Sequence, residues 1–168
     1  EPGLLMWGNI EKSLPAESYA DDGFKTICTN PCGEIPLSAY DSCRLISVNL
    51  KNFVKNPFTE KASFDFSHFS RVAAHAMRLS DDLVELEIEK LDSIIKACDT
   101  SDEVELWENL KAACVNGRRT GLGTHGLADA LACLSLAYDS DEGIEVIDKI
   151  YKTLKISAYT ESVNLAKE

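Results

Sequence analysis

The segment from Asn30 to Glu34 brings together three side chains that can do chemistry on one substrate. Its sequence is Asn30-Pro31-Cys32-Gly33-Glu34. A thiol can act as a nucleophile or give up a hydrogen atom, a carboxylate can accept a proton, and an amide can hydrogen-bond a hydroxyl. In an extended segment, side chains two positions apart lie on the same side. Pro31 would fix the backbone between them, and Gly33 would let it tighten. We therefore expect Asn30, Cys32 and Glu34 to face one ligand.

A second cysteine, Cys43, lies eleven residues after Cys32. Two thiols can pass two electrons to a substrate and end as a disulfide, so Cys43 is a candidate reductant. The residue types alone leave two alternatives open for Cys32: the nucleophile of a hydrolase such as an amidase, or an inert packing residue. A zinc site on Cys28, Cys32 and Cys43 is disfavoured, because structural zinc sites use closely spaced cysteine pairs or paired histidines. We expect no metal ligand.

A glycine-rich segment, Gly121-Leu122-Gly123-Thr124-His125-Gly126, matches the dinucleotide-binding pattern GxGxxG by letter. The residues before it, 116–120, are not the buried strand that this pattern requires. We therefore expect its glycines to permit close packing of a strand against a helix. His125 is expected to be a capping or core-edge residue. Arg118 and Arg119 fit two roles equally well, a phosphate site or ion pairs with an acidic helix surface.

Strands are expected on both sides of the cysteine-bearing segment. A possible strand covers Phe24–Cys28, residues 29–43 form an ordered loop rich in Pro, Gly and small polar residues, and Leu45–Leu50 alternates as a strand does. A further strand or turn is expected at residues 118–123. These short strands precede or alternate with helices, which indicates an α/β fold with a helix-rich second half.

Four helices are expected in that second half. The first has Asp65 or Ser67 as its N-terminal cap, and a short second helix covers Val104–Cys114. The third follows the glycine-rich segment, and the last starts after Ser140. The apolar stripe of the first helix contains Phe69, Val72, Ala73, Ala76, Leu79, Leu83 and Leu86, and that of the last contains Ile144, Ile147, Tyr151, Leu154, Ala158 and Leu165. Ten acidic residues between positions 81 and 105 are expected to form a solvated helix face and its exit loop.

The composition restricts the class of protein. The chain has 168 residues, 45% of them hydrophobic, and a net charge of −11. An acidic surface repels phosphate backbones, so direct DNA or RNA binding is disfavoured. No apolar run is long enough to suggest a membrane span, and six cysteines without a secretion signal favour reduced thiols in the cytoplasm. The chain opens without Met and ends inside a helical pattern, so we expect an internal segment of a larger protein.

Four segments resemble the catalytic subunit of ribonucleotide reductases. The strongest likeness is in Thr29–Leu37 and Tyr40–Leu50, where Asn-x-Cys-x-Glu matches the radical site of that family, and Gly117–Asp129 is similar to a later barrel segment. Glu1–Leu5 looks like the strand that leads to the site. The resemblance implies that residues 1–168 are an internal segment of the catalytic domain. That domain is a ten-stranded α/β barrel with a central finger loop, here at about residues 29–43.

The resemblance also implies a role for each matching residue. Cys32 would become a thiyl radical that removes the ribose 3′ hydrogen, and Glu34 would take the 3′-hydroxyl proton while the 2′-hydroxyl leaves as water. Asn30 would hydrogen-bond the ribose hydroxyls, and Asn30, Pro31, Cys32, Gly33 and Glu34 together would line the substrate site. Cys43 would be one of two reducing cysteines, its partner lying outside this chain. The isolated segment is expected to be inactive.

Within the family, the short gap between Cys32 and Cys43 looks most like the adenosylcobalamin-dependent class; a radical from a di-metal partner subunit is the alternative. The implied enzyme is an oxidoreductase that makes deoxyribonucleotides for DNA synthesis from ribonucleoside diphosphates or triphosphates. Its partners would be the ribonucleotide, a thioredoxin- or glutaredoxin-type reductant and the rest of the catalytic chain. A cysteine hydrolase and a non-catalytic interaction fragment remain as alternatives.

Overall fold

A computed structural model describes residues 4–14, 19–21, 23–42 and 44–168 of the chain. Contacts within the chain divide it into two units. Unit 1 combines residues 1–44 with 84–119, and unit 2 combines 45–83 with 120–168. One long helix, α2 (Phe66–Ile95), contributes its first part to unit 2 and its last part to unit 1.

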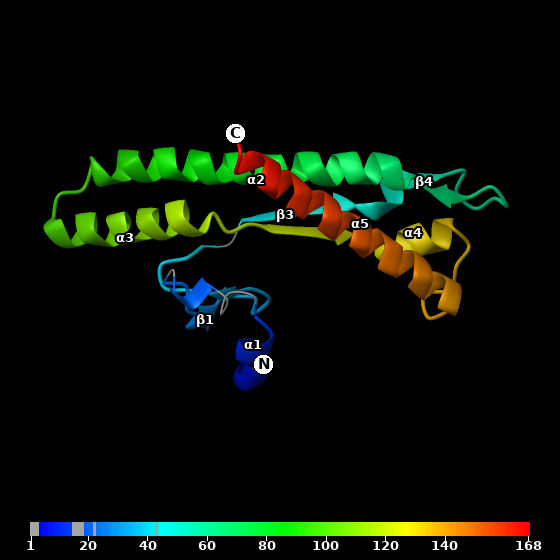
Figure 1. Cartoon of the computed structure of the whole chain (residues 1–168), viewed down its shortest axis with the longest axis horizontal. Coiled ribbons are helices and arrows are strands. Elements are labelled where there is room, and N and C mark those ends of the chain that lie inside the picture. Colours follow the sequence, from blue (N-terminus) through cyan, green and yellow to red (C-terminus); the bar gives the residue numbers. More distant parts are fainter. Residues whose placement is uncertain (1–3, 15–18, 22, 43) are drawn as a thin grey trace. The chain divides into compact units, whose positions relative to one another are not determined.

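Unit 2 contains two small sheets and two helices besides the first part of α2. Strands β3 (Leu45–Asn49) and β6 (Gly121–His125) pair in parallel, with Leu45 opposite Gly121 and Asn49 opposite His125. The other elements are the 3₁₀ helix η2 (Leu50–Phe53), the antiparallel strands β4 (Val54–Lys55) and β5 (Ser63–Phe64), and the helices α4 (Leu127–Cys133) and α5 (Asp141–Leu165). Helix α5 crosses the first part of α2 (Figure 1).

The core of unit 2 is apolar and aromatic. Leu50, Phe69 and Ile150 are fully buried, and Phe53 stacks edge-on against Phe69 with ring centroids 5.0 Å apart. One face of the parallel pair reaches this core through Ile46, Val48 and Leu122, which pack against the buried cluster. Burial of such side chains contributes about 1.5–3 kcal/mol each, so this cluster is the main source of stability in unit 2.

The glycine-rich segment is a strand followed by a turn. Gly121 and Gly123 lie inside β6, and Gly126 starts α4 with a left-handed φ of +71°. A Cβ on Gly126 would come within 2.8 Å of the Asn49 side-chain oxygen, so only glycine fits there. A dinucleotide-binding loop needs its glycines in the turn after the strand. The predicted close packing is confirmed for Gly126, whereas a Cβ on Gly123 would meet open space. Strand β6 starts three residues later than the predicted strand.

The described residues of unit 1 form a short hairpin, two helices, a 3₁₀ turn at residues 19–21 and the last part of α2. The elements are α1 (Trp7–Ser13), β1 (Cys28–Thr29), β2 (Pro36–Leu37) and α3 (Ser101–Gly117). Helix α3 lies alongside the last part of α2 and runs in the opposite direction (Figure 1). Their contact buries Val84, Leu91 and Cys114, a much smaller apolar cluster than that of unit 2.

Local signals place the helix starts. The Asp65 side chain accepts from the His68 amide at the start of α2, and Ser140 accepts from the Gly143 amide at the start of α5, as the sequence predicted. Helix α3 begins three residues before its predicted start. There Thr100 and Glu103 form a reciprocal capping box, which satisfies amide groups that would otherwise lack partners.

The predicted apolar stripes are only partly correct. On α2, Leu79, Leu83 and Leu86 are exposed, while Ser80 and Val84 are buried. On α5, Ile144 and Tyr151 are exposed, Leu154 is buried as predicted, and Ile150 and Ser157 are buried although they were not predicted. The predicted face is thus correct for the first part of α2, where Phe69, Ala73 and Ala76 are buried, and wrong for its later part.

The mixed α/β class with a helix-rich second half is confirmed. The described residues form three two-stranded sheets and contain no closed barrel. The helices among them also include none that is both long and apolar enough to span a membrane.

Candidate functional site

The predicted chemistry lies at the tip of the β1–β2 hairpin. Cys28 pairs with Leu37 and Thr29 with Pro36, so residues 30–35 form the connection between the strands. The Asn30 amide donates to the Ile35 carbonyl at 3.0 Å, and the Ile35 amide donates to the Asn30 side-chain oxygen at 2.9 Å. The hairpin tip is therefore closed by Asn30.

The tip turns back on itself instead of staying extended. Residues 31–35 are turns and bends, Gly33 has a left-handed φ of +79°, and the Gly33 amide donates to the Asn30 carbonyl. Alternation of side chains applies only to extended backbone. The reasoning that placed Asn30, Cys32 and Glu34 on one side is therefore wrong for this segment.

The three residues differ in their surroundings. The side chain of Asn30 is buried and its oxygen is engaged by the backbone, whereas Cys32 and Glu34 are exposed. The thiol and the carboxylate thus lie at the surface of unit 1, two residues apart on the same turn. Cys32 has a free thiol. The fourth predicted residue, Cys43, lies outside the described residues.

Arginines bind the segment that follows the hairpin. Arg44 is buried, and its Nε lies 2.5 Å from a carboxylate oxygen of Glu87 on α2. Arg119 Nε lies 2.7 Å from Oδ2 of Asp41, and Arg118 pairs with Glu85. The choice between phosphate binding and ion pairs is settled here: both Arg118 and Arg119 contact carboxylates.

The acidic stretch is consequently not only a solvated face. Glu85, Glu87 and Asp92 each pair with a cation, the partners being Arg118, Arg44 and Lys111. The pairing of Arg118 with this acidic surface was one of the two predicted roles, whereas the pairs of Arg44 and Lys111 were not predicted. Glu85 and Asp92 are 57% and 45% exposed, so most of this face is still solvated, and of the three only Glu87 meets a buried cation.

Three other free thiols, Cys98, Cys114 and Cys133, are buried or partly buried, whereas Cys28 on β1 is exposed. Cys114 and Cys133 are buried, and burial raises the pKa of the Cys114 thiol even though the Arg44 guanidinium opposes that shift. Burial also raises the pKa of the Cys98 thiol, with Glu103 and Asp99 adding to the effect. A raised pKa leaves less thiolate at neutral pH and makes these thiols poor nucleophiles.

One polar contact was not predicted from the sequence. Nδ1 of His125 lies 2.8 Å from the Ser47 hydroxyl, on the exposed face of the β3–β6 pair. His125 neither caps a helix nor lies at the edge of the core, so its predicted role is wrong. The contact follows from the parallel register of two strands, and neither sequence segment indicates that register by itself.

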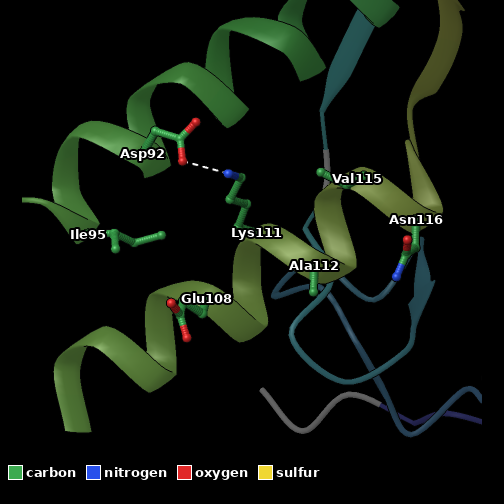
Figure 2. A pocket seen from close by; sticks show the side chains of 7 residues that line it. All are labelled: Asp92, Ile95, Glu108, Lys111, Ala112, Val115 and Asn116. Atoms are coloured by element: carbon green, nitrogen blue, oxygen red, sulfur yellow. Dashed lines mark hydrogen bonds and ion pairs between the residues drawn. The ribbon is translucent and has the colours of Figure 1, made fainter. Parts of the chain in front are cut away.

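A shallow groove of about 330 Å³ lies between α2 and α3 in unit 1. Figure 2 shows Lys111 pointing from α3 toward Asp92 on α2, with an ion pair of 2.5 Å between them, and Glu108 at the same groove. The charge of Lys111 is thus balanced by that of Asp92. None of the predicted site residues lines the groove. Among the described residues, no cluster of three or more His, Cys, Asp or Glu side chains could hold a metal ion.

Comparison with known proteins adds independent information. Residues 16–168 match the family model described as "Ribonucleotide reductase, barrel domain". Over its full length, the chain is 30% identical to a vitamin B12-dependent ribonucleoside-diphosphate reductase from Mycobacterium tuberculosis, of which it covers 20%. It is 29% identical to the enzyme of the same name from Thermoplasma acidophilum, covering 19% of it.

A viral relative is similar over a shorter stretch. The ribonucleoside-diphosphate reductase large subunit of African swine fever virus is 29% identical over 140 residues, which are 83% of this chain and 15% of the relative. The chain therefore spans about a fifth or less of the length of each of these relatives. The matched model covers nearly the whole sequence, including the hairpin with Cys32 and the β3–β6 pair, and the chain belongs to the ribonucleotide reductase barrel-domain family.

Proposed function

We propose that residues 1–168 are an internal segment of the catalytic barrel of a ribonucleotide reductase that acts in the cytoplasm, and that residues 29–43 are its finger loop. The observation that carries the proposal is the hairpin tip, where a family-matching thiol and carboxylate are both exposed. In this proposal the β3–β6 pair supplies two of ten barrel strands. Exposed apolar side chains on α5, such as Ile156, Tyr159 and Val163, support packing against further parts of such a domain.

The chemistry assigns one task to each residue of the tip. Cys32 loses a hydrogen atom, and the resulting thiyl radical takes the 3′ hydrogen of the ribose. Glu34 accepts the 3′-hydroxyl proton as general base, and the 2′-hydroxyl takes a proton from one of the two reducing thiols and departs as water. Asn30 hydrogen-bonds the ribose. Because its side-chain oxygen accepts from Ile35, the Asn30 amide NH₂ is the group left to donate to a hydroxyl.

Two electrons must then reach the sugar. Cys43 and a second cysteine outside this chain supply them and become a disulfide, which a thioredoxin- or glutaredoxin-type protein reduces for the next turnover. The substrate is a ribonucleoside diphosphate or triphosphate.

The radical at Cys32 needs a source, for which we propose adenosylcobalamin. Two vitamin B12-dependent relatives match the chain over its full length, which supports this choice over a di-metal partner subunit. Exposure of the Cys32 side chain fits a thiol that must meet both a radical source and a substrate. When bound, the cofactor supplies the oxidising radical, and Cys32 is the group in this chain that responds to it.

A hydrolase would need a base beside Cys32. Unit 1, which contains Cys32, has no histidine of its own, because His68, His75 and His125 all belong to unit 2. Among the described contacts within unit 1, none activates the Cys32 thiol in the way that a cysteine nucleophile requires. The family match, which includes the hairpin, favours the radical role.

Replacement of Cys32 in the full-length parent enzyme tests the proposal. Cys32→Ser should abolish deoxynucleotide formation while leaving the unfolding temperature near that of the unaltered enzyme, because the side chain is exposed and a hydroxyl O–H bond is too strong to yield the radical. Cys28→Ser is the matched control: Cys28 is a second exposed thiol of the same hairpin and should be dispensable. Product formation by the Cys32→Ser enzyme above a trace would refute the radical role.

A further inference from the structure

The base of the hairpin in unit 1 is held by the side chain of Arg119. One terminal nitrogen of its guanidinium donates to the Pro36 carbonyl at 2.8 Å, and its Nε lies 2.7 Å from Oδ2 of Asp41. The Asp41 side chain is only 3% exposed, so this ion pair is shielded from water on the carboxylate side. A single side chain thus binds the return strand β2 and the segment after it.

Arg44 fixes Arg119 in turn. The Arg44 guanidinium donates to the Arg119 carbonyl at 2.8 Å, to Glu87 on α2, and to the Cys114 sulfur on α3 at 2.9 Å. Its side chain is 7% exposed. A planar guanidinium can satisfy three acceptors at once, whereas an ammonium on a flexible stem acts as a point charge. The loop is therefore joined to both helices by a network of four side chains, those of Arg44, Glu87, Arg119 and Asp41.

The strand that enters the hairpin meets the same end of α3. The ring of Phe24, which precedes β1, lies so close to Gly117 that a Cβ there would be 3.2 Å from Cε1 of that ring. The segments on both sides of the hairpin thus contact residues 117–119. A hairpin with only two residue pairs is not stable alone, so these contacts are what determines where its tip lies.

We propose that Arg119 is a positioning residue for the Cys32 thiol, and that Arg44 keeps Arg119 in place. The proposal rests on the proposed function, because it assumes that Cys32 reacts. Cys32 and Glu34 lie between Thr29 and Pro36, the pair at the base of the tip. Release of the Pro36 carbonyl would let this turn shift, and a displacement of about 1 Å at a reacting group costs roughly a hundredfold in rate.

The experiment compares Arg119→Lys with Arg118→Lys in the full-length enzyme. Lysine at position 119 keeps the charge beside Asp41 but cannot also hold the Pro36 carbonyl in the same geometry. Arg118, the neighbouring residue, pairs with Glu85 and makes the matched control. Three quantities are measured for each variant: kcat, KM, and amide hydrogen exchange of the peptide that contains residues 26–37.

Arg119→Lys should raise exchange of the Ile27, Asn30 and Ile35 amides, all of which donate within the hairpin. It should lower kcat by about tenfold to a hundredfold with KM changed less than about twofold. Arg118→Lys should change none of these, and Arg44→Lys should repeat the Arg119→Lys result in weaker form. If Arg119 only stabilised the fold, Arg119→Lys would lower the unfolding temperature without lowering kcat at a nearly constant KM.

Unchanged exchange in the Arg119→Lys hairpin would overturn the proposal, as would raised exchange with full turnover. Failure of the proposed function would look different. If the Cys32→Ser enzyme still made product, the radical role would be lost, but the exchange comparison would still decide whether Arg119 holds the hairpin, because it depends on no activity.

Discussion

The buried side chains of unit 2 are mostly apolar, whereas unit 1 combines a small apolar cluster with buried charges. Ten buried residues form the unit 2 cluster, and Phe53, Phe64 and Phe69 make mutual ring contacts within it. In unit 1 the apolar cluster has three buried members, and Arg44 is buried beside it. Apolar burial is non-directional, but hydrogen bonds and ion pairs require particular angles and distances.

The difference matters because the hairpin with Cys32 belongs to unit 1. A directional network can fix a loop in one arrangement where a small apolar cluster would allow several. It is also more vulnerable, because loss of one partner leaves an uncompensated charge. Unit 2, in contrast, should respond to lost volume and hardly at all to lost charge.

The largest expected effect is in the apolar unit. Phe69→Ala should lower the free energy of unfolding of unit 2 by about 4 kcal/mol, because Phe69 is fully buried among aromatic rings and its loss leaves a cavity. Amide exchange of α5 under native conditions measures this. The exposed Phe58 provides the control, since Phe58→Ala removes little buried surface. A loss below about 1 kcal/mol would mean that the cluster is loosely packed.

A smaller effect is expected from one charge in unit 1. Glu87→Ala should destabilise unit 1 by roughly 2 kcal/mol, because Arg44 stays buried without its carboxylate while Glu87 itself is partly exposed. Both tryptophans of the chain, Trp7 and Trp107, lie in unit 1, so their fluorescence during urea unfolding reports on that unit. Glu85→Ala on the same helix is the control, since exposed ion pairs contribute about 0–1 kcal/mol. Equal effects of the two substitutions would contradict the view that unit 1 depends on a buried charge and its partner.

The smallest effect concerns an exposed ion pair of unit 2. Arg78 contacts Glu161 and both carboxylate oxygens of Glu168, and the bond from Arg78 holds the pKa of Glu168 below its ordinary value. A carboxyl with a lowered pKa stabilises the fold above its unfolded pKa, and the contribution is lost as pH falls through the folded value.

Protection of α5 from exchange should therefore decline modestly below about pH 4. In Glu168→Gln this part of the decline should be absent, whereas Lys167→Gln should leave it intact. A pH profile of α5 that is the same in Glu168→Gln and in the unaltered protein would show that the pair contributes nothing to stability.

Local sequence signals predicted much of the fold. The alternation of Leu45–Leu50, the Asp65 cap and the Ser140 cap located β3, α2 and α5 to within about a residue. Those signals depend only on neighbouring residues. The buried face of α2 was missed because its later part packs against α3, which places Val84 rather than Leu83 in the interior. Tertiary contacts of that kind override the apolar pattern.

The geometry of the candidate site differs from the sequence prediction, and its residues stay a prediction. Asn30, Cys32 and Glu34 do lie together on one turn, yet the bonds of Asn30 to Ile35 fold that turn in a way that side-chain alternation does not anticipate. Arg44 meets Glu87 and Cys114 on helices far along the chain, and Arg119 reaches back to Pro36 and Asp41, so neither arginine has its partners nearby in the sequence. Whether Cys32, Glu34, Asn30 and Cys43 act as proposed stays a prediction.

The parallel pairing of β3 with β6 also has a kinetic consequence. All of α2 and α3 lies between the two strands, so their alignment closes a long loop of chain before any strand hydrogen bond forms. Loop closure grows more costly in entropy with length, and folds dominated by such non-local contacts form slowly. Helices α2 and α3 form from local contacts, so we expect them to appear early during refolding and protection of the Ser47 and Gly123 amides to appear late.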